Sequence, residues 1–217
     1  MNNIVNLHLH YFPFAGRAAA IRDALHIGGV AFEDVHIPHD QFRTLKAAGE
    51  FPFGALPMID IETTTGKVRA VQSNAILRLA GRLSSLYPVD DLVQALKVDE
   101  ALELGENINE LLGPSLHEND TERKMAMRKI LAEETLPRWV GYFERLLVTN
   151  GRTGFVVGNS LSVADLKLYW VSDFLTNGNL DGIPTTLLDN FVTVVAWRKN
   201  ITAVRETRLA KAKKLKI

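Results

Sequence analysis

FGALPMIDIE, residues 53–62, is the stretch that decides how this chain folds. Proline has no backbone N–H to give to a strand ladder, so Pro57 predicts a turn directly before a strand at Met58–Glu62. A cis bond between Leu56 and Pro57 would turn the Leu56 N–H and C=O outward, where an extended ligand can pair with them. We therefore expect a ligand-binding loop at this point.

A second strand and a helix are expected directly after this stretch. The strand, at about Lys67–Val71, follows the polar turn Thr63–Gly66 and ends at Gln72-Ser73. Beyond Ser73 the apolar residues follow helical spacing, at Ile76, Leu77, Ala80 and Leu83. A helix N-terminus presents unpaired N–H groups and partial positive charge, which suits a carboxylate or a phosphate. Simple capping by Ser73 is the alternative interpretation.

The start of the chain predicts a strand, a helix and a further strand. Alternating residues over Ile4–His10 predict the first strand. Its apolar face is expected to consist of Val5, Leu7 and Leu9. Helical spacing after Gly16 predicts a helix to about Ile27, and Phe32–Ile37 predicts the second strand. With the later hairpin and helix, and a proline before the hairpin, this order predicts a thioredoxin-like α/β unit.

The rest of the chain has a helical pattern. Residues 84–91 have the composition of a linker, so we expect a thioredoxin-like domain over 1–83 and an all-α helical domain over 92–217. One helix is expected at Leu92–Leu112, ending before Gly113-Pro114. Another is expected at about Thr121–Val148, with a kink or restart at Pro137.

Two patterns in the helical part predict buried structure. An apolar stripe at helical spacing is expected in the core, and it consists of Trp139, Phe143, Leu146 and Leu147. Ser162 and Asp165 have the spacing of a capping box, which predicts a helix start. Leu161 and Leu166 flank this box in the positions of a hydrophobic staple.

Composition limits the classes of function. The 25 basic and 25 acidic residues leave no net charge to hold a nucleic acid or an anionic membrane. No run reaches the length of a membrane span, and the N-terminus lacks signal-peptide features, so we expect a cytoplasmic protein. The absence of cysteine excludes thiol–disulfide exchange by the protein itself and thiolate metal sites, and we expect no metal.

A thioredoxin-like unit followed by an all-helical domain resembles the soluble glutathione transferases, and motifs agree along nearly the whole chain. Tyr11-Phe12 followed by Gly16-Arg17-Ala18 resembles the tyrosine-type start of that family. Residues 53–57 resemble its segment that pairs with the cysteine of glutathione, and Gln72-Ser73 resemble its γ-glutamyl carboxylate site. Ser162–Asp165 resembles the family's folding-related cap. The chain is most similar to the sigma class in Glu33-Asp34-Val35, Ile37-Pro38 and Asp40-Gln41-Phe42.

The resemblance implies a chemistry and a set of site residues. Tyr11 would be catalytic: its hydroxyl would donate to the glutathione sulfur and favour the thiolate, whose unperturbed pKa is about 8.5. The thiolate would be conjugated to small hydrophobic electrophiles, or would reduce organic peroxides, with glutathione as co-substrate. The residues implied to contact glutathione are Phe12, Arg17, Phe42, Lys46, Ala55, Leu56, Pro57, Gln72, Ser73, Glu103 and Asp99. The electrophile pocket is expected to include Phe14, Leu104 and Ile108.

Two residues depart from the family pattern. Gln or Lys often stands at the position of Ala55, and Trp at the position of Phe42, where a phenylalanine ring has no N–H to donate. We therefore expect weaker glutathione binding, by about 1 kcal/mol for each lost hydrogen bond. Lys46 remains available for the glycyl carboxylate, and Arg17 for the electrostatics of the tyrosine or the helix start.

The resemblance also implies a homodimer with shared sites. Phe53, a large apolar residue on a loop, is placed to anchor in a partner chain. Glu103, or as second choice Asp99, would take the glutathione α-amino group of the neighbouring subunit; a solvated acidic face is the alternative. Two other functions remain open, namely a glutathione-dependent isomerase of prostaglandin-type endoperoxides and a non-catalytic ligand-binding or structural protein on the same fold.

Overall fold

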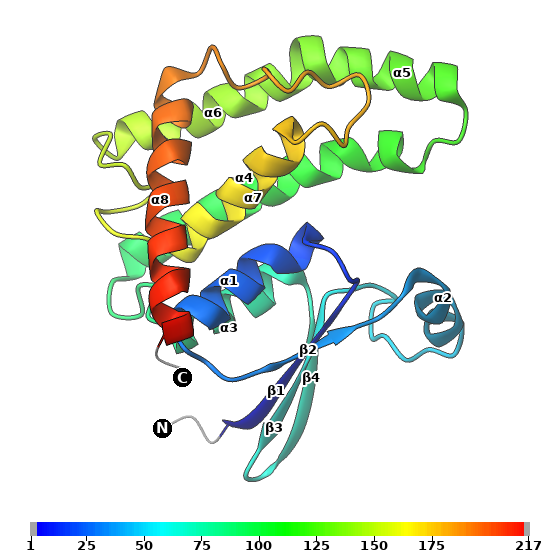
Figure 1. Ribbon diagram of the computed structural model, residues 1–217, viewed down its shortest axis with the longest axis vertical. Helices are drawn as coiled ribbons and strands as arrows, with labels where there is room; N and C mark the ends of the chain where they lie inside the picture. The colour runs from blue at the N-terminus through cyan, green and yellow to red at the C-terminus, as the bar shows by residue number, and fades with distance from the viewer. Residues whose placement is uncertain (1–3, 215–217) are drawn as a thin grey trace. The chain divides into compact units, whose positions relative to one another are not determined.

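The computed structural model describes residues 4–214, and it divides into two compact units. The first contains the described residues up to Tyr87 together with those from Arg208 onward, and the second contains Pro88–Thr207 (Figure 1). Residues 1–3 and 215–217, at the ends of the two expected domains, lie outside the described residues. The expected fold class, a mixed α/β unit with an all-helical unit, is confirmed.

The first unit is built on a four-stranded sheet in the order β2-β1-β3-β4. Its strands are β1 (Ile4–Tyr11), β2 (Glu33–His36), β3 (Met58–Thr63) and β4 (Gly66–Val71). β1 runs parallel to β2 and antiparallel to β3, and β3 and β4 form an antiparallel hairpin. This mixed topology is the one that the order of elements predicted.

Three whole helices, a short turn and the end of α8 (Val192–Lys214) belong to this unit as well. A 3₁₀ turn at Gly16–Ala18 leads into α1 (Ala19–Ile27), while α2 (His39–Ala47) and α3 (Ser73–Leu83) follow β2 and β4. α1 and α3 lie side by side (Figure 1). The core of the unit includes Leu7, Leu9, Ile21, Leu25, Ile76 and Leu77, all of them buried. These are the positions that helical and strand spacing assigned to the core.

One expected core residue of β1 lies on the surface. Val5 is 59% exposed, whereas Leu7 and Leu9 are buried. The pairing of β1 with β3 shifts register between Ile4 and Asn6, so the alternation of the strand breaks where Val5 stands. Because a one-residue slip turns a side chain to the other face of a sheet, the prediction for Val5 was wrong.

Polar side chains pair across the strands on the other face of the sheet. The ring nitrogen Nε2 of His10 lies 3.1 Å from a carboxylate oxygen of Asp60, which also accepts two hydrogen bonds from Arg69. Burial lowers the pKa of His10 below 6.5, although the Asp60 carboxylate acts in the opposite direction. The folded chain therefore favours the neutral imidazole at this position.

The second unit is helical throughout its regular structure. Its helices are α4 (Leu92–His117), α5 (Thr121–Ile130), α6 (Leu136–Thr149), α7 (Val163–Thr176) and the greater part of α8 (Val192–Lys214). A π-helical turn, Leu131–Thr135, joins α5 to α6. Within residues 4–214, none of the helices combines the length and apolar character that crossing a membrane requires.

The two prolines expected to interrupt helices, Pro114 and Pro137, behave differently. α4 continues through Gly113-Pro114 to His117, contrary to the prediction. Pro114 removes only one hydrogen bond in the last turn, and the buried Ser115 hydroxyl donates to the carbonyl of Leu112 at 3.0 Å. Pro137 does restart the helix: it lies in the first turn of α6, directly after the π-helical turn.

The apolar stripe of α6 is shifted from the predicted one. Phe143 and Leu147 are buried, but Trp139 and Leu146 are only partly covered. The buried face continues through Leu136 and Val140 instead, at the same helical spacing. Trp139 packs edge to face against Tyr142, with ring centroids 5.5 Å apart.

The capping box at the start of α7 is confirmed. The buried carboxylate of Asp165 accepts hydrogen bonds from the Ser162 N–H at 2.9 Å and the Ser162 hydroxyl at 3.0 Å. It also accepts from the Val156 N–H at 2.8 Å and the indole N–H of Trp197 at 3.0 Å. Burial raises the pKa of Asp165 to about 6, and these donors oppose the rise. Leu161 and Leu166, the predicted staple, are both buried.

Candidate functional site

The expected catalytic tyrosine stands at the end of β1. Tyr11 is 4% exposed, and its hydroxyl oxygen accepts a hydrogen bond from the backbone N–H of Arg17 at 3.0 Å. Gly16 brings Arg17 into place by adopting a φ of +42°, a region that suits glycine. A Cβ on Gly16 would lie 2.5 Å from the Tyr11 hydroxyl oxygen, so this position requires the absence of a side chain.

The surroundings of Tyr11 keep its hydroxyl protonated at neutral pH. Burial raises the pKa of Tyr11 above 10, while the Arg17 N–H and the cationic side chains of Arg17 and Arg22 act in the opposite direction. Since the oxygen accepts the Arg17 N–H, the hydroxyl proton is available for donation to a ligand atom. A neutral hydroxyl in this arrangement can stabilise an anion such as a thiolate.

Aromatic rings connect the Tyr11 loop with α2. The rings of Phe12 and Phe42 meet edge to face with centroids 5.2 Å apart, and Phe12 stacks on His39 at 4.4 Å. Phe14 packs edge to face against Tyr11 at 5.7 Å and is 49% exposed. The structure therefore brings together Tyr11, Phe12, Phe14 and Phe42, which the sequence predicted as site residues.

Strand register places three predicted segments at one end of the sheet. Met58 pairs with His10 on one side and with Val71 on the other. Tyr11 follows His10, Pro57 precedes Met58, and Gln72 follows Val71, so all three lie at the same end. The cis-proline loop and the start of α3 therefore lie beside the catalytic tyrosine candidate.

The peptide bond between Leu56 and Pro57, for which the sequence left a cis form open, is cis. Both side chains are buried, whereas Ala55 before them is exposed. Within residues 4–214, neither the N–H nor the C=O of Leu56 takes part in a hydrogen bond of the protein. These two groups can therefore pair with an extended ligand.

Lys46 extends from α2 toward the cis-proline loop. Its Cε would lie 3.3 Å from a Cβ built on Gly54, whose φ is +62°. Its ammonium nitrogen is 5.7 Å from the centroid of the Phe42 ring. Lys46, Phe42 and Gly54 thus form one corner of the candidate site, and Lys46 supplies its positive charge.

The predicted start of a helix at Ser73 is confirmed, because α3 begins at that residue. Gln72, not Ser73, is the residue that flanks the helix, and the buried Ser73 is its first helical residue. The interpretation of Ser73 as an ordinary N-cap is therefore wrong, because its backbone already belongs to the helix. Gln72 has φ 79° and ψ 113°, an unusual conformation for a residue with a side chain, which costs about 1–3 kcal/mol. Such strain is concentrated at ligand sites.

The predicted residues of α4 belong to the second unit. Leu104 and Ile108 are buried there, Glu103 is exposed and Asp99 is partly exposed. Their roles stay predictions. Among the described residues, no group of three or more metal-ligating side chains could hold a metal ion.

Arg22 is a site residue that the sequence interpretation missed. From α1 its guanidinium donates to the carbonyls of Phe14 at 2.8 Å and Phe12 at 3.3 Å, and through Nε to Asp34 at 2.9 Å. Its Cζ lies 5.7 Å from the centroid of the Tyr11 ring. Its position in the sequence could have indicated this role. Arg22 stands four residues after the buried Ala18 and three before the buried Leu25, which places it at the edge of the apolar face of α1.

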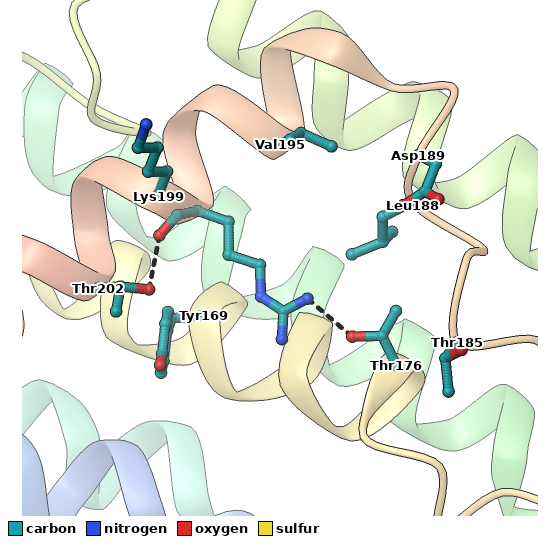
Figure 2. A pocket seen from close by; sticks show the side chains of 9 residues that line it. Tyr169, Thr176, Thr185, Leu188, Asp189, Val195, Lys199 and Thr202 are labelled. Atoms are coloured by element: carbon teal, nitrogen blue, oxygen red, sulfur yellow. Dashed lines mark hydrogen bonds between the residues drawn. The ribbon is translucent and has the colours of Figure 1, made fainter.

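A separate cleft of about 370 Å³ lies in the second unit, between α7, α8 and the connection that joins them (Figure 2). Arg198 lines it and donates to the Thr176 hydroxyl at 2.7 Å and to Asp173 at 3.3 Å. None of the predicted glutathione or electrophile residues lines this cleft. It is therefore distinct from the candidate site at Tyr11.

Comparisons with known proteins agree over most of the chain. Residues 106–208 match the family model described as glutathione S-transferase, C-terminal domain. Glutathione S-transferase A3 of Homo sapiens is 31% identical over 201 residues, which cover 89% of this chain and 82% of that protein. Glutathione S-transferase alpha M14 of Sus scrofa is 32% identical over 203 residues, with the same shares covered.

Solved structures show the same fold. The sigma class GST of Fasciola hepatica has a TM-score of 0.80 at 24% identity, covering 98% of this chain and 97% of its own. Prostaglandin synthase D of Nilaparvata lugens has a TM-score of 0.79 at 24% identity, covering 95% of this chain and 98% of its own. With the sequence relatives matched over most of both chains, this chain belongs to the glutathione S-transferase family.

Proposed function

We propose that this chain holds glutathione as a thiolate through the Tyr11 hydroxyl and transfers it to small hydrophobic electrophiles. The observation that supports this best is the hydrogen bond from the Arg17 N–H to the Tyr11 oxygen at 3.0 Å. It fixes the hydroxyl and leaves the hydroxyl proton to be donated to sulfur. Because burial raises the pKa of Tyr11, the donor stays neutral over the range in which the thiol ionises.

The chemistry requires little more than this donor and correct placement. The thiol of glutathione loses its proton to solvent, and the Tyr11 O–H stabilises the sulfur anion that remains. The thiolate then attacks an electrophilic carbon and expels the leaving group, or it attacks a peroxide oxygen and expels an alkoxide that takes up a proton. Proximity and electrostatics supply the acceleration.

The proposed glutathione site follows the end of the sheet. The cis-proline loop, Ala55 to Pro57, would pair through the Leu56 backbone with the cysteine of glutathione. Gln72 and Ser73 would hold the γ-glutamyl carboxylate at the positive N-terminus of α3. Lys46 would hold the glycyl carboxylate, with Phe42 beside it.

Two of these contacts are expected to be weaker than usual in the family. The Phe42 ring has no N–H to donate, and the methyl side chain of Ala55 makes no polar contact. Each missing hydrogen bond would reduce glutathione affinity by about 1 kcal/mol. Phe12 and Arg17 complete the set of proposed contacts.

Further parts of the proposal rest on the resemblance to the family. The electrophile pocket would use Phe14, Leu104 and Ile108. The active form would be a homodimer, in which the 68% exposed Phe53 is an apolar anchor and Glu103 or Asp99 reaches the neighbouring glutathione. A division into domains at 1–83 and 92–217, joined by a linker, and a cytoplasmic role in detoxification belong to the same proposal.

We assign the chain to the tyrosine-type transferases with sigma-class character. Three motifs support the class, namely Glu33-Asp34-Val35, Ile37-Pro38 and Asp40-Gln41-Phe42. The relatives found by sequence include alpha transferases, and the solved structures include a sigma one. A glutathione-dependent isomerase of prostaglandin-type endoperoxides is the alternative activity, which the resemblance to the sigma class permits; one structural neighbour is named prostaglandin synthase D.

Two measurements separate the candidate functions. The chain is passed over immobilised glutathione, and the retained protein is assayed with a chromogenic aryl halide and with a prostaglandin endoperoxide. We expect retention and turnover of the aryl halide. Retention without any turnover would indicate a ligand-binding protein, and turnover of the endoperoxide alone would indicate the isomerase.

A further inference from the structure

A single arginine side chain holds the loop that joins Tyr11 to its hydrogen-bond partner. Residues 12–15 connect the end of β1 to the 3₁₀ turn that presents the Arg17 N–H. Arg22 donates through Nη1 to the carbonyls of Phe14 at 2.8 Å and Ala15 at 3.4 Å, and through Nη2 to that of Phe12 at 3.3 Å. Three backbone acceptors of this short loop thus share one rigid fork of donors.

The fork is fixed from its other side by a carboxylate. Nε of Arg22 donates to both oxygens of Asp34, at 3.1 Å and 2.9 Å. Asp34 stands on β2, and its backbone is paired with Leu9 of β1, two residues before Tyr11. Arg22, on α1, therefore ties the loop to the same part of the sheet from which Tyr11 extends.

The positive charge of this fork also lies close to the reacting group. The Cζ of Arg22 is 5.7 Å from the centroid of the Tyr11 ring, and its side chain is only 15% exposed. A partly desolvated cation over a phenol ring favours negative charge on and near the hydroxyl. The same field favours a thiolate that accepts a hydrogen bond from the hydroxyl.

We propose that Arg22 is the positioning residue for Tyr11, clamping the 12–15 loop so that the hydroxyl aims its proton at the glutathione sulfur. This inference rests on the proposed function, since it concerns the same thiolate. A merely structural arginine would stabilise the loop without changing the ionisation of bound glutathione. The ionisation is therefore the property to measure.

The test compares the thiolate absorbance of bound glutathione across pH in Arg22→Lys, Arg22→Met and Asp34→Asn. Lysine keeps the charge but, as a compact ammonium, cannot reproduce the fork. We expect the thiolate midpoint to rise by about one pH unit in both Arg22 variants, and by less in Asp34→Asn. Turnover at saturating glutathione should fall by about tenfold or more. The matched control is Arg82→Met, since Arg82 also lies over a tyrosine ring, that of Tyr87, at 5.3 Å.

The outcomes distinguish this inference from the proposed function. If Tyr11→Phe raises the thiolate midpoint and Arg22→Lys does not, the clamp is refuted and the role of Tyr11 stands. If Tyr11→Phe leaves the midpoint unchanged, the proposed function itself fails. A matching rise in Arg82→Met would also refute the clamp, because a change remote from the loop would then have the same effect. Thermal unfolding and retention on immobilised glutathione show that each variant is folded.

Discussion

Gly16→Ala tests whether the geometry around Tyr11 determines activity. Alanine at a φ of +42° costs about 1–2 kcal/mol of backbone strain. Its Cβ would also lie 2.5 Å from the hydroxyl oxygen of Tyr11 and 2.9 Å from a ring carbon of Phe14. Relief of that contact requires the hydroxyl to move by about 1 Å, because non-bonded heavy atoms approach to roughly 3.5 Å.

Such a displacement would break the hydrogen bond between the Arg17 N–H and the Tyr11 oxygen, which is 3.0 Å long. A misplacement of about 1 Å at a reacting group can lower the rate by about 100-fold. We therefore expect Gly16→Ala to reduce turnover of a chromogenic aryl halide by about 100-fold at saturating glutathione. Its free energy of unfolding in urea should fall by about 1–2 kcal/mol.

Gly29→Ala is the matched control. Gly29 has a φ of +65°, so alanine there has comparable backbone strain, but no described atom lies within 4 Å of the added Cβ. This variant should lose similar stability and keep its turnover. If the turnover of Gly16→Ala stays within about twofold of that of Gly29→Ala, the steric reasoning about Tyr11 is refuted.

Three further predictions address stability and assembly. Asp165→Asn should lower the free energy of unfolding in urea by about 2–4 kcal/mol. Both carboxylate oxygens of Asp165 accept hydrogen bonds, so either orientation of an asparagine amide places its NH₂ group against buried donors. Unchanged stability would contradict this reasoning. Phe53→Ser should weaken the proposed dimer and lower its activity together, whereas Glu103→Ala should raise only the glutathione concentration needed for half-saturation. Sedimentation and activity are measured on the same samples across dilution, and a fully active monomer would refute the proposal that the site is shared between subunits. Because burial holds the pKa of His10 below 6.5, the stability that its neutral form contributes is present above pH 6.5 and lost as pH falls below it. His10→Asn should therefore flatten the decline of the urea midpoint between pH 7 and pH 5.5, and an equal decline in both proteins would reject this.

Local signals predicted most of the architecture. Pro57 predicted the turn directly before β3 and left a cis bond open, and the spacing of Ser162 and Asp165 predicted the start of α7. These signals act within a few residues, so a single sequence contains them in full. The motif around Tyr11 likewise predicted Tyr11 as a site residue, and in the structure its hydroxyl accepts a hydrogen bond from the Arg17 N–H.

Features that depend on contacts between elements were predicted less well. Val5 is exposed because of a register shift between strands, and α4 passes Pro114 where the buried Ser115 hydroxyl closes its last turn. Arg22 was missed because its role arises from carbonyls seven or more residues away and from Asp34 on a neighbouring strand. Periodicity reports which face of a helix is buried, and it does not report which polar group an edge residue will reach.

The role of the Tyr11 hydroxyl is tested by the ultraviolet absorbance of the glutathione thiolate bound to the wild-type chain and to Tyr11→Phe, titrated across pH. The substitution removes the hydroxyl donor and keeps the ring, so glutathione should bind almost normally to both proteins. We expect a wild-type thiolate midpoint below about pH 8.5 and a midpoint in Tyr11→Phe that returns toward that value. Identical titrations of the two proteins would contradict the claim that the Tyr11 hydroxyl stabilises the thiolate.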